Sequence, residues 1–140
     1  MEVCCIDIGP GNIDLLEGFI GKLGRASETF RYYNKRPVNV ISNHLTTLML
    51  TEDKMPVAYG HLEFENDTMW LGICVLPEKE GKGFGQLMMQ RLIEKAKDKN
   101  IEKIDLTVDR INLKAIRLYE KFDFYKVSEH DSYFRYRLSL

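Results

Sequence analysis

Two adjoining segments at residues 57–65 and 69–76 constrain the fold most strongly. In the first, side chains alternate between the two faces of a strand, with Ala58, Gly60, Leu62 and Phe64 on one face and Tyr59, His61, Glu63 and Glu65 on the other. The second is almost wholly apolar, as in a central strand that is covered on both faces. Asn66 and Asp67 between them are typical of a tight turn. The pair therefore predicts a hairpin within a sheet.

The remaining segments predict helices placed between strands. Further strands are expected at 3–8, 46–51, 104–108, 124–127 and 133–138. Helices are expected from Asn12 or Asp14 to residue 23, at 84–97 and at 112–122, with a shorter one that begins at Ser27 and stops before Pro37. This order predicts an α/β fold. The strand at 133–138 would lie at a sheet edge and be available for pairing in a homodimer.

Length and composition limit the classes of protein. The 140 residues suit a single domain, 1–140. Lys and Arg total 20 against 21 Asp and Glu, so the net charge of -1 argues against nucleic acid as the main partner. No apolar stretch is long enough to cross a bilayer, and no signal peptide is visible, so no membrane role is expected. Three cysteines, two of them adjacent, make a poor disulfide framework, which indicates a cytoplasmic protein.

A glycine-rich loop joins the apolar strand to the next helix. Gly81, Gly83 and Gly85 alternate with other residues directly before the helix. Glycine lets the backbone approach a bulky ligand, and a helix start offers unpaired N–H groups with the positive end of a dipole. These features suit a pyrophosphate. The spacing fits neither a P-loop nor a Rossmann fingerprint. An ordinary glycine-rich turn is the alternative.

The loop and a later helix together resemble the GNAT superfamily of acetyl-CoA-dependent N-acetyltransferases. The loop 80–85 matches the family's Arg/Gln-x-x-Gly-x-Gly/Ala motif, and the helix 112–122 carries Asn112, Ala115-Ile116, Leu118-Tyr119 and Phe122 in the family's order. The resemblance covers roughly residues 70–127. It implies a mixed, mostly antiparallel central sheet flanked by about four helices, with acetyl-CoA as co-substrate and no metal ion.

The resemblance also implies site residues. Val75 and Leu76 match the backbone that pairs with the pantetheine arm, Asn112 the Asn beside the thioester, and Tyr119 the general acid that protonates the departing thiolate. The amides around the pyrophosphate are expected from Lys82, Gly83, Phe84, Gly85 and Gln86. Glu80 stands where the family has Arg or Gln, which predicts weaker cofactor binding, offset by Lys79 and Lys82.

Acetyl transfer to an amine requires a base. An amine of pKa ~10.4 is mostly protonated at neutral pH, a penalty of roughly 4.6 kcal/mol for the reactive form. His61 and Glu63, on one face of the strand 57–65, are the candidate bases, with a solvated strand face as the alternative. His44 and His130 lie outside any periodic pattern and are expected at the surface.

For two further side chains, an ordinary packing role is the alternative to a catalytic one. Tyr119 on an amphipathic helix is ordinarily a core residue, and as an acid its contribution would be at the lower end of ~10²–10⁴. Cys74 has no His or Asp partner placed beside it, so we expect a small buried side chain and no acyl-enzyme.

The acceptor should bind the first half of the chain. Arg31 and Tyr32, in a segment dense in aromatic and basic residues, would meet an anionic or sugar-bearing acceptor, unless this segment is simply a surface helix. The leading hypothesis is acetylation of a small-molecule amine: an amino sugar, amino acid or polyamine. Ribosomal-protein-type N-terminal acetylation is the second hypothesis, weakened because Thr107 replaces that group's Glu. A non-catalytic acyl-CoA-binding module is the third.

Overall fold

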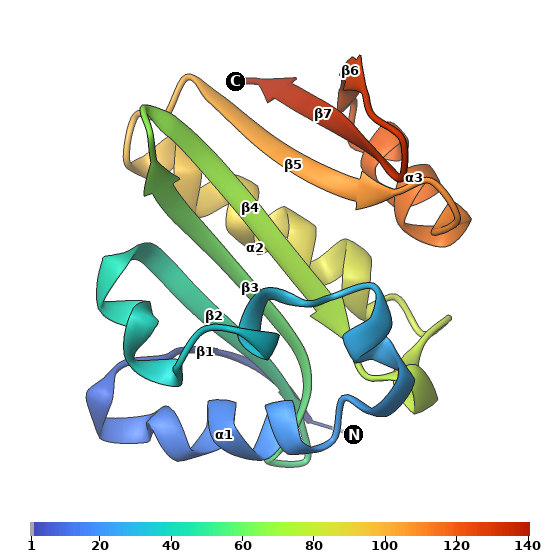
Figure 1. Ribbon diagram of the computed structural model, residues 1–140. Coiled ribbons are helices and arrows are strands. Elements are labelled where there is room, and N and C mark those ends of the chain that lie inside the picture. Colours follow the sequence, from blue (N-terminus) through green and yellow to red (C-terminus); the bar gives the residue numbers. More distant parts are fainter. Residues whose placement is uncertain (1) are drawn as a thin grey trace.

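The structure, a computed structural model, describes residues 2–140 as one seven-stranded sheet with helices on both faces (Figure 1). Its strands are β1 (Val3–Asp7), β2 (His44–Glu52), β3 (Met55–Glu65), β4 (Thr68–Val75), β5 (Lys103–Asp109), β6 (Tyr125–Glu129) and β7 (Tyr133–Ser139). Its α-helices are α1 (Ile13–Gly21), α2 (Phe84–Asp98) and α3 (Leu113–Lys121). The strand order is β1-β2-β3-β4-β5-β7-β6, and every neighbouring pair is antiparallel except β4 and β5. The predicted α/β fold with a mixed, mostly antiparallel sheet is confirmed.

The central hairpin forms as predicted. β3 and β4 pair in register from Ala58 opposite Val75 to Glu65 opposite Thr68. Asn66 and Asp67 both have positive φ, 52° and 62°, the backbone conformation of a type I′ turn.

The polar face of β3 is buried and not solvated. Ala58 and Leu62 pack beneath α2, whereas Tyr59 packs on the opposite face with α1. Figure 1 shows α2 behind the sheet and α1 with the 3-10 helices in front of it. His61 and Glu63 are 2% and 8% exposed, so the alternative of a solvated strand face is wrong for this strand.

β4 and β5 meet at one point and then separate. Their register rests on a single pair, Trp70 opposite Asp105, and toward their carboxyl ends the two strands diverge (Figure 1). Asp105 is buried and accepts hydrogen bonds from Arg135 at 2.8 Å and Arg137 at 2.7 Å. These bonds tie β5 to β7 beside the junction, so the sheet stays closed there and opens at the other end.

Two sequence predictions about the arrangement of helices and strands are wrong. The segment from Ser27 to Pro37 is not one helix, because its 3-10 helices η2 (Gly24–Glu28) and η3 (Tyr32–Asn34) are separated where Phe30 packs onto the core. A third, η4 (Val38–Asn43), follows Pro37. The strand at 133–138 is not at an edge, because β7 pairs with β5 on one side and β6 on the other.

Within residues 2–140, no helix is both long enough and apolar enough to span a membrane.

Candidate active site

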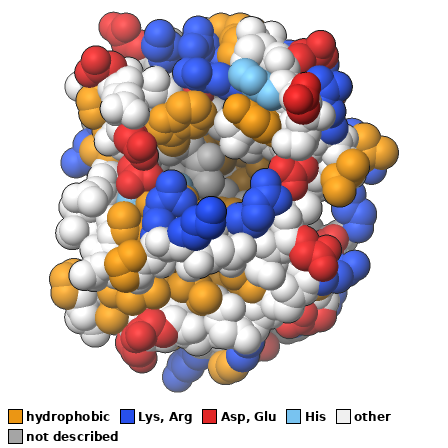
Figure 2. All heavy atoms as spheres, viewed as in Figure 1, with side chains coloured by type: hydrophobic (Ala, Val, Ile, Leu, Met, Phe, Trp, Pro, Cys, Tyr) orange, Lys and Arg blue, Asp and Glu red, His pale blue; other side chains and the backbone are white. Residues whose placement is uncertain are grey.

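A cleft of about 1250 Å³ opens where β4 and β5 diverge. Its walls are the ends of these strands, the starts of α2 and α3, and the segment 25–36 in front. Figure 2 shows the hollow from this side, with basic side chains at its rim. The arginines and lysines that line it are Arg25, Arg31, Arg36, Lys79, Lys114 and Arg135.

The three glycines of the loop before α2 are explained by two different structural requirements. Gly81 and Gly83 have φ of 77° and 87°, the left-handed region that disfavours a side chain. A Cβ on Gly85 would lie 3.3 Å from Leu118, so its absence lets α2 and α3 approach closely. The loop is therefore shaped by backbone conformation and packing together.

The backbone N–H groups of residues 82–86 have no hydrogen-bond acceptor among residues 2–140. The first paired amide is that of Leu87, which donates to the carbonyl of Gly83. Gly83, Phe84, Gly85 and Gln86 all line the cleft, whereas exposed Lys82 does not. The start of α2 thus presents unpaired donors and the positive end of its dipole to the cleft.

Val75 and Leu76 differ in what their backbones offer. The amide of Leu76 donates to the carbonyl of Val57 at 3.0 Å, and the Leu76 side chain is buried. Because alternate residues of a strand direct their backbone groups to opposite sides, Val75 directs its groups toward the gap beside β5. Val75 lines the cleft and Leu76 does not.

Glu80 is neutralised by residues other than those expected. Its carboxylate pairs with Lys114 at 3.2 Å and with Arg25 at 3.6 Å. Lys79 instead pairs with Glu52 at 2.7 Å, and Lys82 makes no ion pair within residues 2–140. Lys79 and Lys82 therefore do not neutralise Glu80 directly, because its carboxylate faces α3 and η2.

Asn112 and Tyr119 are both held by α3. Asn112 caps the helix, since its Oδ1 accepts the amide of Ala115 at 3.3 Å. Tyr119 is 7% exposed and packs against Phe124, yet it lines the cleft. Its hydroxyl has no hydrogen-bond partner in the described part of the chain. Burial, and then neighbouring Cys74, raise the pKa of Tyr119 well above its ordinary value, so the phenol keeps its proton.

Cys74 behaves as expected from sequence. The residue is buried, and burial, followed by the charge of Glu80, raises the pKa of its thiol to about 12. A protonated thiol is a poor nucleophile, so Cys74 is not set up to carry an acyl group.

The two candidate bases are placed differently. His61 lines the cleft but is only 2% exposed, and its Nδ1 lies 2.7 Å from the hydroxyl of Tyr59. Burial, then His44 and Arg36, hold the pKa of His61 well below its usual range. Glu63 accepts a hydrogen bond from Tyr32 at 3.0 Å through one carboxylate oxygen and lines the cleft.

His44 is not a surface residue. It begins β2 opposite Glu63, half-buried, with its ring stacked on His61 at a centroid distance of 4.5 Å. Its Nε2 lies 2.7 Å from the Tyr32 hydroxyl and its Nδ1 lies 2.8 Å from Oγ1 of Thr47. Sequence reasoning missed His44 because the contacts that define its role come from the register of β2 on β3. His130 is exposed, as expected.

The donor atoms of His44, His61 and Glu63 lie within 4.8 Å of one another, a set that can hold a metal ion. The two imidazoles are stacked, however, with an interplanar angle of 27°, so their in-plane lone pairs do not converge on one point. The Tyr32 hydroxyl is also hydrogen-bonded to both His44 and Glu63. The arrangement therefore fits a hydrogen-bonded cluster better than a coordination site.

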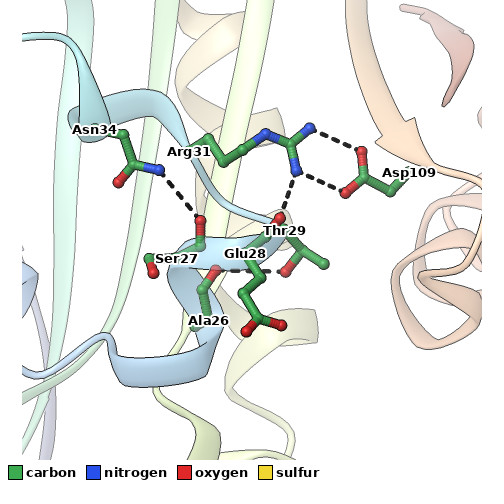
Figure 3. A network of polar contacts seen from close by, with 7 residues as sticks. All are labelled: Ala26, Ser27, Glu28, Thr29, Arg31, Asn34 and Asp109. Atoms are coloured by element: carbon green, nitrogen blue, oxygen red, sulfur yellow. Dashed lines mark hydrogen bonds and ion pairs between the residues drawn. The ribbon is translucent and has the colours of Figure 1, made fainter. Parts of the chain in front are cut away.

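Arg31 crosses the mouth of the cleft. Its guanidinium makes two hydrogen bonds to Asp109 at the end of β5, each 3.0 Å long, and a third to the carbonyl of Glu28 (Figure 3). The pair ties the segment 24–36 to β5 and neutralises the charge of Arg31.

Gly72→Ala should destabilise the fold by about 1–3 kcal/mol, because a Cβ at Gly72 would lie 2.4–3.0 Å from the buried ring of His61. Gly18→Ala is the matched control, since its Cβ would meet nothing within 4 Å inside α1. That variant should gain about 0.5–1 kcal/mol. Urea unfolding measures both, and equal stability of the two variants would contradict the tight contact.

Three comparisons with known proteins agree with this geometry. The profile of the Acetyltransferase (GNAT) family matches residues 17–124. An N-acetyltransferase of Archaeoglobus fulgidus is 31% identical over 117 residues, which cover 71% of this chain and 77% of that protein.

Solved structures share the fold at low identity. The PaiA N-acetyltransferase of Thermoplasma acidophilum, in complex with coenzyme A, has a TM-score of 0.79 at 17% identity and full coverage of both chains. The ribosomal-protein-S18-alanine N-acetyltransferase of Escherichia coli has a TM-score of 0.76 at 16% identity, covering 99% of this chain and 94% of that one.

Proposed function

This chain belongs to the GNAT acetyltransferase family, and on that premise we propose that it transfers the acetyl group of acetyl-CoA to a primary amine of a small molecule. The amine attacks the thioester carbon directly, a carbon–nitrogen bond forms, and the carbon–sulfur bond breaks to release coenzyme A. The observation that carries the proposal is the set of unpaired amides at residues 82–86 beside the cleft.

In this proposal the start of α2 holds the diphosphate of coenzyme A. The amides of Gly83, Phe84, Gly85 and Gln86 would donate to it, and Lys82 would add charge from outside the cleft. Hydrogen bonds to a charged group contribute about 1.5–3 kcal/mol each. Val75 would pair with the pantetheine arm through its backbone, and Asn112 would lie beside the thioester.

Glu63 is the better candidate for the general base. The pKa of His61 is too far depressed to hold a proton near neutral pH, and its Nδ1 is already bonded to Tyr59. Glu63 reaches the cleft and has one oxygen that accepts no hydrogen bond within residues 2–140. That oxygen would receive the proton from the acceptor ammonium or from the amine as it attacks.

Among the arginines of the cleft, Arg36 has no ion pair in the described part of the chain and lies over the Tyr32 ring, but two others are already neutralised. Arg31 is paired with Asp109 and Arg135 with Asp105, so neither offers a free charge. Glu63 has no cationic partner among residues 2–140. This supports Glu63, more than Arg31, as the charged residue that contacts the acceptor, with Tyr32 hydrogen-bonded to its carboxylate.

Tyr119→Phe should lower kcat about 100-fold and leave the Kd of acetyl-CoA within about twofold. The hydroxyl would donate its proton to the departing thiolate, whereas the ring packs in the core and survives the change. Tyr136→Phe is the matched control, because that buried hydroxyl bonds Glu120 outside the cleft. Wild-type turnover in Tyr119→Phe would remove this residue from the mechanism.

A panel of primary amines, read by release of coenzyme A thiol, tests the proposed acceptor class. Amino sugars, amino acids and polyamines should include substrates, whereas peptides with free N-termini should react poorly because Thr107 offers no carboxylate there. Reaction with peptides alone would replace the proposal with N-terminal acetylation. No thiol release with any amine would indicate an acyl-CoA-binding module.

A further inference from the structure

A chain of hydrogen bonds runs from β2 through the front segment to Glu63. Oγ1 of Thr47 lies 2.8 Å from Nδ1 of His44, and Nε2 of His44 lies 2.7 Å from the Tyr32 hydroxyl. The same hydroxyl lies 3.0 Å from Oε1 of Glu63. Four side chains from three separate segments are thus linked in one line.

We propose that Thr47, His44 and Tyr32 form a one-directional hydrogen-bond chain that holds Glu63 in position as the base, with His44 in its Nε2–H tautomer. This inference rests on the proposed role of Glu63. His44, Thr47 and Tyr32 are positioning residues, because they act on the acceptor only through that carboxylate.

Proton counting fixes the direction of the chain. The Tyr32 hydroxyl has one proton and two neighbours, Nε2 of His44 and the carboxylate of Glu63. An ionised carboxylate can only accept, so the hydroxyl must donate to it. Nε2 of His44 must then be the donor to the Tyr32 oxygen. This leaves Nδ1 as an acceptor, and the hydroxyl of Thr47 can donate to it.

The surroundings keep His44 neutral. Burial, together with the positive charge of Arg36, lowers the pKa of His44 to about 4. The titratable groups that face its ring are Tyr32, His61, Arg36 and Glu63. A neutral imidazole has one N–H, as the chain requires, and it would keep that state from pH 6 to pH 8.

The chain has a consequence for the base. Tyr32 occupies one oxygen of Glu63, and its ring packs at a tilt against His61, with the centroids 4.4 Å apart, which restrains the phenol. The other oxygen therefore has a fixed direction toward the cleft. Loss of His44 frees Tyr32 to rotate or to donate elsewhere, so the carboxylate loses its orientation.

Nitrogen NMR of ¹⁵N-histidine-labelled protein tests the tautomer without any acceptor. The chain holds three histidines, and exposed His130 serves as the internal reference. We expect His44 to be neutral and protonated at Nε2 from pH 6 to pH 8. In Glu63→Leu, Tyr32 should donate to His44 instead, and the proton should move to Nδ1. A charged His44, an Nδ1–H tautomer in the wild type, or no change in Glu63→Leu would overturn the proposal.

Coupled kinetics test the positioning role with an amine that the panel identifies. Tyr32→Phe and His44→Leu should each lower kcat about tenfold with KM within about twofold, and the double variant should be no slower than Tyr32→Phe alone. His44→Gln retains a donor near Nε2 and should recover most of the loss. If the losses in kcat of the two single variants multiply in the double variant, or if His44→Gln recovers no activity, the proposed hydrogen-bond chain is contradicted. If Glu63→Gln is fully active, the proposed base fails instead, while the NMR result stands independently.

Discussion

Gly83→Glu should abolish the binding of acetyl-CoA, with a loss in affinity of at least about 100-fold. The substitution adds a side chain where φ is 87° and places a carboxylate beside the amides proposed to hold the diphosphate. A Cβ at this position meets no atom within 4 Å, so the fold should survive the change. The negative charge of the new carboxylate would repel the negatively charged diphosphate. A side chain at this left-handed backbone position is also strained.

The thermal shift on adding acetyl-CoA measures this effect. At a ligand concentration 100 times Kd, binding stabilises the folded state by about 2.7 kcal/mol, on the order of 10 °C for a chain of this size. The shift should vanish in Gly83→Glu. Gly24→Glu is the matched control, because Gly24 also has positive φ and open space for a Cβ but does not line the cleft. A full shift in Gly83→Glu would contradict the proposed cofactor site.

Glu63→Gln should lower kcat/KM by about 10²–10³-fold at pH 7. An amine of pKa ~10.4 is unprotonated in about one molecule in 2500 at this pH, so loss of the base exposes most of that penalty. The defect should shrink as pH rises, because solvent then supplies more free amine. Burial raises the pKa of Tyr119 well above its ordinary value, so this tyrosine stays protonated while the comparison is made.

A pH–rate profile of the wild type and the variant measures this convergence. Glu65→Gln is the control, since Glu65 lies two residues along the same strand but is exposed. We expect it to stay within about threefold of the wild type. A defect in Glu63→Gln that is constant from pH 7 to pH 9.5 would show that Glu63 does not act as the base.

Features encoded by consecutive residues were predictable from sequence. The alternation of residues 57–65, the Asn66-Asp67 turn and the loop with Gly81 and Gly83 each follow from local backbone preferences. Asn112 at a helix start was predictable in the same way, since it caps α3. These elements give the β3–β4 hairpin beside the cleft and the position of the unpaired amides.

Features that depend on contacts between distant segments were not predictable. His44 reaches Glu63 only through the pairing of β2 with β3, and Arg31 meets Asp109 across 78 positions of the chain. Glu80 is neutralised by Lys114, 34 positions away, and not by its neighbours in sequence. No periodic pattern carries such information.

Two wrong predictions, one of secondary structure and one of the position of a strand in the sheet, have the same origin. Tertiary packing divides the segment 24–43 into 3-10 helices because Phe30 and Tyr33 insert toward Tyr59. β7 becomes an inner strand because β6 folds back onto it. Local propensity describes neither event.

A crystal structure of the complex with coenzyme A tests most directly whether the start of α2 binds the diphosphate of the nucleotide. The account predicts diphosphate oxygens about 3 Å from the main-chain nitrogens of residues 83–86, with the pantetheine running along Val75 between β4 and β5. A nucleotide bound elsewhere, with these nitrogens bonded to other protein atoms, would contradict it.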